Sequence, residues 1–343
     1  MPSITQIIDN VVAVQRKTPG AAFLISGKPG EGKSDCCYDI AAAQDIPPHR
    51  IKRVHLGNYD RVELGGVPEI TTHEPTGERI TVFRPTDIFA DFADGTGKSM
   101  VILEEAAQQD RDMQQFVAQF TLDRETCNFK LDPECRILLT GNRAEDRAGA
   151  KPLLSHLNDR LYHQDMETSL DDWCAWAMDN DVDPLGVAFL RLRPDLLNDF
   201  DPNRRSNPTQ RSWTKLFTEV PTDMPTAGYL SVAEGKVGEG AAAEWVAARD
   251  MMHKMPSIDS IRLHPDNAEV PTEPAVRFAV ATALSMTTDP QAFARDMQYV
   301  SRMPKEFQMV YVTDALRLNP QLQQTKDFID WAIKNKDIFM GGN

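Results

Sequence analysis

No stretch of the 343 residues is apolar over the roughly 20 positions that a membrane-spanning helix needs. Residues 1–10 also lack the basic patch and following apolar stretch of a secretory signal. Cysteine is scarce, with 5 residues in all, and their spacing fits no metal-binding pattern. An odd, unpatterned set of cysteines favours reduced thiols in a reducing compartment. These absences predict a cytoplasmic protein with no membrane partner.

Positive charge is also in short supply. The sequence has 37 Lys and Arg against 51 Asp and Glu, a net charge of −14. Nucleic-acid binding needs clustered Lys and Arg to neutralise phosphates, and no basic run with interleaved aromatics occurs, so nucleic acid is disfavoured as a partner. An acidic protein can still form a ring with a basic lumen, so nucleic-acid binding is kept as an alternative. The 7 histidines show no HxxxH or HExxH spacing, which leaves a histidine-based metal site without support.

One glycine-rich loop stands out against these absences. Residues 27–34 read G-K-P-G-E-G-K-S and fit the phosphate-binding pattern G-x-x-x-x-G-K-[S/T] at every fixed position. The apolar run at 22–26 is typical of a buried parallel strand, and residues 36–44, free of glycine and proline, are typical of a helix. The sequence therefore predicts a strand, a helix and, between them, a nucleotide-binding loop formed by Gly27, Lys28, Pro29, Gly30, Glu31, Gly32, Lys33 and Ser34.

The chemistry of this loop is the capture of an anion. Its glycines let backbone N–H groups turn inward, and a helix that begins near Lys33 points its positive dipole end at the same place. Lys33 adds a mobile cation for the β- and γ-phosphates, and Ser34 offers a hydroxyl to Mg²⁺. Residues 142–146 fail the guanine-specificity pattern, because the Asn-to-Asp spacing is one residue too long and the lysine is absent. ATP with Mg²⁺ is therefore the predicted ligand.

Two further strands are predicted to end in polar side chains. Residues 100–103 are apolar and run directly into Glu104 and Glu105, and the apolar run 136–140 is followed by Gly141 and Asn142. Ligands of open α/β sheets bind at the carboxyl ends of the strands. In nucleotide hydrolases the first carboxylate there holds Mg²⁺ and the second polarises the attacking water. Asn142 is a candidate to orient that water or to sense the γ-phosphate.

The pattern changes near residue 167. Strands and helices alternate up to a fifth strand at 162–166, whereas the segments beyond it have helical spacing. This predicts an α/β domain over 1–166 and an all-α region over 167–343. Within the first domain, a glycine-rich connection at 57–68 and a β-hairpin at 70–83 are candidates for a pore or partner face.

Six motifs follow one another along the chain: the phosphate loop, L-G-G-V-P at 64–68, Glu104-Glu105, T-G-N at 140–142, N-D-R-L at 158–161 and R-S-W at 211–213. In their order and spacing they resemble the motifs of MoxR-like AAA+ ATPases, over essentially the whole chain. The tail, at residues 235–239 and 304–307, is similar to a subgroup common in bacteria and their phages.

The resemblance implies an AAA+ P-loop αβα core with a parallel sheet, followed by an all-α lid. It implies a homo-oligomeric ring, usually of six subunits, with ATP between neighbours, in a bacterial cell or in the host of a phage. The ring would remodel a protein partner, often one with a von Willebrand factor A-type domain. By this resemblance, Ser34 and Glu104 are ligands of Mg²⁺ and Glu105 is the carboxylate that polarises water. Asn142 is the first sensor, Arg160 the arginine finger and Arg211 the second sensor.

Two residues depart from the family pattern. Glu104 stands where the family has Asp, and the extra methylene moves the carboxylate by roughly 1.5 Å, enough to affect catalytic geometry. Gln210 stands where the family typically has Pro, which weakens the helix start only slightly. Three alternatives stay open: a nucleotide-gated assembly protein with little turnover, a phage DNA motor or loader, and, more weakly, a small-molecule kinase.

Overall fold

The computed structural model describes residues 3–84, 86–126, 129–143, 149–167 and 169–336. Its contacts divide the chain into two compact units, Met1–Thr168 (the first unit) and Ser169–Asn343 (the second unit). Cys127 and residues 144–146 of the rejected guanine motif lie outside the described residues. The four described cysteines are free and buried. Within the described residues, every helix is too short or too polar to cross a membrane.

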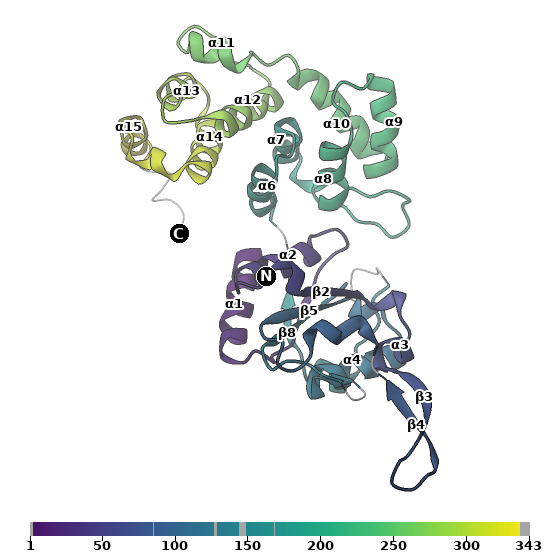
Figure 1. Ribbon diagram of the computed structural model, residues 1–343. Helices are drawn as coiled ribbons and strands as arrows, with labels where there is room; N and C mark the ends of the chain where they lie inside the picture. Colours follow the sequence, from purple (N-terminus) through teal and green to yellow (C-terminus); the bar gives the residue numbers. More distant parts are fainter. Residues whose placement is uncertain (1–2, 85, 127–128, 144–148, 168, 337–343) are drawn as a thin grey trace. The chain divides into compact units, whose positions relative to one another are not determined.

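The first unit is built on a five-stranded sheet in the order β2-β5-β8-β1-β9 (Figure 1). All four neighbouring pairs are parallel. Every residue of β1, β5 and β8 is buried, which explains why these strands are continuous apolar runs rather than alternating ones. The strands are β1 (Phe23–Ser26), β2 (Ile51–His55), β5 (Ser99–Glu104), β8 (Cys135–Gly141) and β9 (Tyr162–Asp165).

Strand β1 marks the point where the strand order reverses. The chain moves from β2 through β5 to β8 on one side of β1, and then places β9 on its other side. In open α/β sheets this switch point opens a crevice at the carboxyl ends of the strands. Because the strands are parallel, the carboxyl ends of β1, β5 and β8 share one edge of the sheet.

Apolar layers cover both faces of the sheet, and the period of two along each strand decides which residue faces which layer. On one face, Ile25 and Ile102 pack with α1 (Ile4–Lys17) and α2 (Lys33–Ala42). On the other face, Leu24 packs against α4 (Arg111–Asp123) and its neighbours. This αβα layering, followed by the helical second unit, confirms the predicted fold class.

Short elements complete the first unit. The predicted hairpin is confirmed as β3 (Val67–Thr72) and β4 (Arg79–Arg84), which project from the body of the unit (Figure 1). A small pair, β6 (Glu125–Thr126) and β7 (Phe129–Lys130), follows α4. The remaining short helices are α3 (Arg61–Gly65) and α5 (Ser155–Asn158), with 3-10 turns at Pro48–Arg50, Leu56–Asn58, Asp87–Phe92 and Ala106–Gln108.

The interpretation of residues 57–68 as a connection alone was wrong. The Asp60 carboxylate accepts a hydrogen bond from the Glu63 N–H, and the Glu63 carboxylate accepts one from the Asp60 N–H, a capping box that starts α3. Gly66, at φ 120°, ends this helix. The capping pattern was present in the sequence, but the glycines on either side of it concealed so short a helix.

The described residues of the second unit form only helices and turns. Its core contains Phe189, Trp213 and Trp245, and the ring of Phe189 contacts both tryptophan rings. The helices are α6 (Leu170–Asp179), α7 (Pro184–Leu192), α8 (Gln210–Glu219), α9 (Thr226–Val237), α10 (Glu239–Met252), α11 (Ile258–Leu263), α12 (Pro274–Thr287), α13 (Phe293–Val300), α14 (Lys305–Leu318) and α15 (Lys326–Lys334), with 3-10 turns at Pro194–Leu196 and Pro320–Gln324.

A buried polar network joins helices of the second unit. Asp296 is fully buried and accepts two hydrogen bonds from Arg262, at 2.9 Å each. Thr288 and Tyr311 donate to the same carboxylate at 2.8 and 3.3 Å. Burial, together with the charge of Asp296, raises the pKa of Tyr311, which keeps its hydroxyl a donor. Four donors thus satisfy one buried charge, as stability requires.

Candidate nucleotide-binding site

The loop after β1 has the backbone that its glycines predict. Gly30 and Gly32 have φ of 79° and 82°, in the left-handed region that glycine enters at little cost. Gly27 has close neighbours instead, since a Cβ there would lie 2.7 Å from a carboxylate oxygen of Glu31 and 3.1 Å from the backbone oxygen of Met166. Gly32 precedes α2, whose start has no side-chain cap. The amino end of a helix is a favourable place for an anion, and the loop leads directly into it.

Lys33 connects the loop to the next strand. Its Nζ donates to the carbonyl oxygens of Gly27 and Lys28, at 2.8 and 2.7 Å. It also donates to Oδ1 of Asn142, at 3.0 Å, just beyond the end of β8. The predicted phosphate cation and the predicted sensor are thus in direct contact, although they are 109 positions apart in the sequence.

Ser34 and Glu104 form the second contact between predicted site residues. The Ser34 hydroxyl donates to Glu104 Oε1 at 2.5 Å, from the first turn of α2 to the last residue of β5. Glu104 is only 7% exposed. The extra methylene of Glu therefore does not remove the carboxylate from Ser34.

This oxygen pair fits Mg²⁺. A hydroxyl and a carboxylate are the hard oxygen ligands that the ion prefers, and Mg²⁺ is usually held by one or two protein oxygens together with substrate phosphates and water. Among the described residues, no group of three or more His, Cys, Asp or Glu side chains could hold a metal ion by itself. Ser34 and Glu104 would therefore hold the ion only together with a bound nucleotide.

Glu105 follows β5 in a strained position. Its φ is 61°, a value that is uncommon for a residue with a side chain and that concentrates at functional sites. Its N–H donates to Thr140 Oγ1 at 3.4 Å. Its side chain is about half exposed and lies 3.6 Å from Nε2 of His55. The turn thus separates Glu105 from Glu104, which stays inside against Ser34.

Two basic residues of β2 escaped the sequence analysis. Arg53 Nε lies 3.3 Å from Glu104 Oε2, and His55 contacts Glu105. In the register of β2 and β5, Arg53 is opposite Ile102 and His55 is opposite Glu104. The available signal was the period of two in this strand, which places residues 53 and 55 on one face, but only the strand order shows that β5 is the neighbour.

Glu31 is an unexpected acid inside an anion-binding loop. It is 3% exposed, and its carboxylate accepts a hydrogen bond from the Lys28 N–H at 2.7 Å. Burial raises the pKa of this carboxyl, while that hydrogen bond and the charges of Lys33 and Arg143 act in the opposite direction. The side chain thus braces the first part of the loop and brings negative charge close to Lys33.

The two predicted arginines lie elsewhere. Arg160 donates to the Ala118 carbonyl of α4 at 2.7 Å and precedes β9, whose first residue pairs with the first residue of β1. It therefore lies at the amino ends of the strands, while the loop lies at their carboxyl ends, roughly 13 Å away for four-residue strands. Arg211 is exposed in the first turn of α8, in the second unit. Their implied roles stay predictions.

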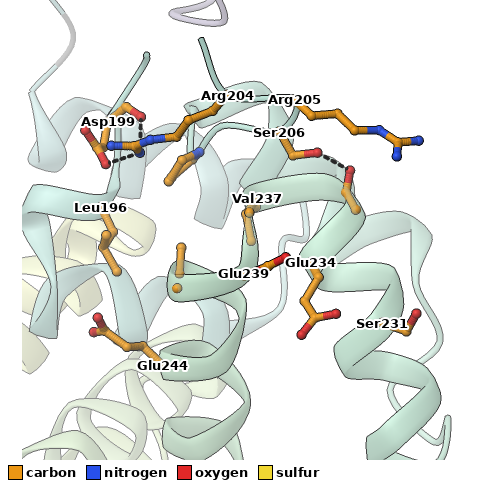
Figure 2. Close-up of a pocket in the computed structure, with 15 residues that line it drawn as sticks. Leu196, Asp199, Arg204, Arg205, Ser206, Ser231, Glu234, Val237, Glu239 and Glu244 are labelled. Carbon is orange, nitrogen blue, oxygen red and sulfur yellow. Dashed lines mark hydrogen bonds and ion pairs between the residues drawn. The ribbon is translucent and has the colours of Figure 1, made fainter. Parts of the chain in front are cut away.

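A second glycine-rich stretch, residues 235–240, also borders a cavity. Residues 235–237 end α9, Gly238 separates the two helices and residues 239–240 begin α10, so a helix and not a strand precedes this stretch. The cavity has a volume of about 800 Å³. Figure 2 shows that four carboxylates and two guanidinium groups line it, and Arg204 is paired with Asp199. The excess of negative charge disfavours phosphate. The charged lining residues are Asp199, Arg204, Arg205, Glu234, Glu239 and Glu244.

Comparisons with known proteins give only distant structural matches. No family model matches the sequence, and no curated protein matches it. Among solved structures, NtrX from Brucella abortus in complex with ATP is 14% identical over 99% of this chain and 69% of that chain, with a TM-score of 0.39. A DNA polymerase III gamma subunit-related protein from Thermotoga maritima is 11% identical over 90% and 99%, with a TM-score of 0.36. Scores below 0.5 carry no inference about this chain.

Proposed function

We propose that this chain is an AAA+ ATPase of the MoxR-like type, which uses ATP binding and hydrolysis to remodel a protein partner. The observation that carries the proposal is the meeting of Lys33, Ser34, Glu104 and Asn142 at the carboxyl ends of β1, β5 and β8. A phosphate loop alone supports nucleotide binding. The added carboxylate and amide supply what phosphoryl transfer to water needs.

Each side chain has a role in this proposal. Lys33 would exchange at least one of its carbonyl contacts for phosphate oxygens. Ser34 and Glu104 would hold Mg²⁺, which would supply positive charge beside the phosphates. Glu105 orients and polarises the attacking water. Asn142, already in contact with Lys33, senses the γ-phosphate. Positioning and charge stabilisation of this kind account for most of the catalysis in phosphoryl transfer.

The position of Arg160 supports a ring. An arginine at the amino ends of the strands is at the wrong edge of the sheet to reach its own loop. In the proposed ring it would reach the loop of a neighbouring copy. An arginine supplied in trans adds several powers of ten to the rate of related phosphoryl transfers. We therefore include a homo-oligomeric ring, six-membered by resemblance, in which Arg211 contributes to the nucleotide site of its own chain.

The partner face is proposed to include the β3–β4 hairpin. The side chains of Val67, Ile70 and Phe83 on this hairpin are at least half exposed. Exposed apolar surface of this kind is typical of a protein-interaction site. A protein with a von Willebrand factor A-type domain is the partner that the family resemblance implies. The proposed location is the cytoplasm, as the sequence predicts.

The test is the ATPase rate per chain as a function of protein concentration, for wild type, Glu105→Gln and Arg160→Ala, each sized with and without ATP. We expect the rate to rise as rings assemble. Glu105→Gln should form rings that retain ATP, and Arg160→Ala should bind ATP normally but lose about a thousandfold in turnover. A concentration-independent rate, with Arg160→Ala at the wild-type level, would contradict the shared site.

The contact between His55 and Glu105 favours one alternative, a nucleotide-gated assembly protein with little turnover. An imidazole 3.6 Å from this carboxylate competes with the attacking water for it. In that case wild type binds ATP and assembles, but hydrolyses it no faster than Glu105→Gln. The same measurements therefore separate the two functions.

A further inference from the structure

We propose that Arg53 is a positioning residue for Glu104, which adapts the site to the longer acid found at the end of β5. The inference rests on the proposed function, because it assigns Arg53 a role in Mg²⁺-dependent nucleotide binding. The two contacts of one carboxylate carry it. Oε1 of Glu104 accepts from Ser34 at 2.5 Å, and Oε2 lies 3.3 Å from Nε of Arg53.

The strand register explains why Arg53 reaches this carboxylate. Arg53 is opposite Ile102, so Glu104 is its diagonal neighbour, two residues further along β5. Such pairs lie on the same face of a sheet, within reach of long side chains. That face is the one covered by α2, because Ile102 packs with the buried residues of α2. Arg53, Glu104 and Ser34 therefore meet in one layer.

The chemistry of a longer acid makes such a partner useful. Glu has one more rotatable bond than Asp, so its carboxylate needs an additional restraint to stay beside Ser34. Arg53 supplies that restraint from the side away from the loop. Because its side chain is 53% exposed, the ion pair adds little to folding stability. Its effect is therefore expected in ion binding rather than in folding.

The experiment measures the Mg²⁺ concentration that half-saturates the Mg²⁺-dependent part of ADP binding, using a fluorescent ADP analogue and the full chain. The variants are Arg53→Gln, Glu104→Asp and the double variant. Lys52→Gln is the matched control, because it removes a neighbouring cation from the opposite face of β2. Binding of the analogue without Mg²⁺, and thermal unfolding without nucleotide, are measured in parallel.

We expect Arg53→Gln to raise the half-saturating Mg²⁺ concentration about tenfold, as is usual when the partner of a metal ligand is removed. Binding without Mg²⁺ and thermal unfolding should stay unchanged, and Lys52→Gln should behave as wild type. In the Glu104→Asp background, Arg53→Gln should change the Mg²⁺ requirement less than about twofold, because the shorter acid no longer depends on the arginine.

Two results would overturn the inference while leaving the proposed function intact. One is an equal effect of Arg53→Gln and Lys52→Gln, which would mean that only the local charge matters. The other is an equal effect of Arg53→Gln with Glu or Asp at position 104. If wild type shows no Mg²⁺-dependent binding of the analogue, the proposed function itself fails, and the role of Arg53 fails with it.

Discussion

Two carboxylates of this chain, Glu104 in the first unit and Asp296 in the second, are each paired with an arginine but in contrasting ways. Asp296 is fully buried and has four donors, two of them from a single guanidinium group. Glu104 has one donor from Ser34 and one longer contact to a half-exposed Arg53.

The difference teaches how to separate structural from functional polar groups. Removing one partner of a saturated buried charge leaves that charge without compensation, so the network is retained for stability. A carboxylate with spare acceptor capacity beside a glycine-rich loop can exchange its partners for an ion or a ligand. We infer that Asp296 serves folding and Glu104 serves nucleotide chemistry, and the predictions below test this contrast.

The largest effect is expected from Arg262→Ala. It leaves Asp296 buried with the hydroxyls of Thr288 and Tyr311 as donors, which should lower the free energy of unfolding by about 4 kcal/mol. Urea unfolding followed by tryptophan fluorescence measures it, because all 5 tryptophans lie in the second unit. Binding of the ADP analogue should be unchanged.

The matched control is Arg317→Ala, which breaks the more exposed pair between Arg317 and Asp179. It should cost less than about 1 kcal/mol, as exposed pairs do. An equal loss in both variants would mean that the Asp296 network is no more important than a surface ion pair.

The next effect is expected from Lys33→Ala, the opposite case. In the proposed function, Lys33 replaces contacts within the protein by contacts to phosphate. Without it, affinity for the ADP analogue should fall about 100-fold, because charge-assisted hydrogen bonds to phosphate are lost. The tryptophan-monitored unfolding of the second unit should be the same as in wild type. Retained affinity would show that the loop does not bind the phosphates through Lys33.

The smallest effect is expected from Glu31→Gln. This variant tests whether the hydrogen bond from the Lys28 N–H to the side chain of residue 31 needs a charged acceptor. Burial raises the pKa of Glu31 above its ordinary value of 4.5, so the folded chain disfavours the ionised form. Relative to Glu31→Gln, the wild-type chain therefore has its highest stability below pH 4.5, where Glu31 is protonated. It loses this stability as the pH rises through the raised pKa. At pH 7 the glutamine variant should therefore be the more stable of the two chains.

Thermal unfolding of the two chains over a series of pH values measures this difference. The comparison with Glu31→Ala separates charge from bracing, because only glutamine retains an acceptor for the Lys28 N–H. A stability difference that does not vary with pH would mean that Glu31 titrates normally.

Local patterns predicted most elements of the fold. The helices at α1, α4 and α12 and the sheet strands follow from apolar spacing and from glycine and proline at the ends of segments. The helices α9, α11 and α14 have weaker local signals than the others. Two internal glycines weaken the helical pattern of α9, α11 has only six residues, and the run V-Y-V-T in α14 favours a strand by propensity. Packing of Tyr229, Ile261 and Tyr311 into the core of the second unit overrides these local preferences.

The sequence by itself determined the phosphate loop, the acidic end of β5 and the amide after β8, because each is a short motif whose chemistry is local. It also determined that these groups share one edge, since carboxyl ends of parallel strands do. The contacts around these motifs became visible only in the tertiary structure. Arg53 lies beside Glu104, His55 beside Glu105, and the Glu31 carboxylate beside Gly27. The two contacts from β2 depend on strand order and register, which are set by packing between segments far apart in the chain. The Glu31 contact depends on the path of the backbone through two left-handed glycines.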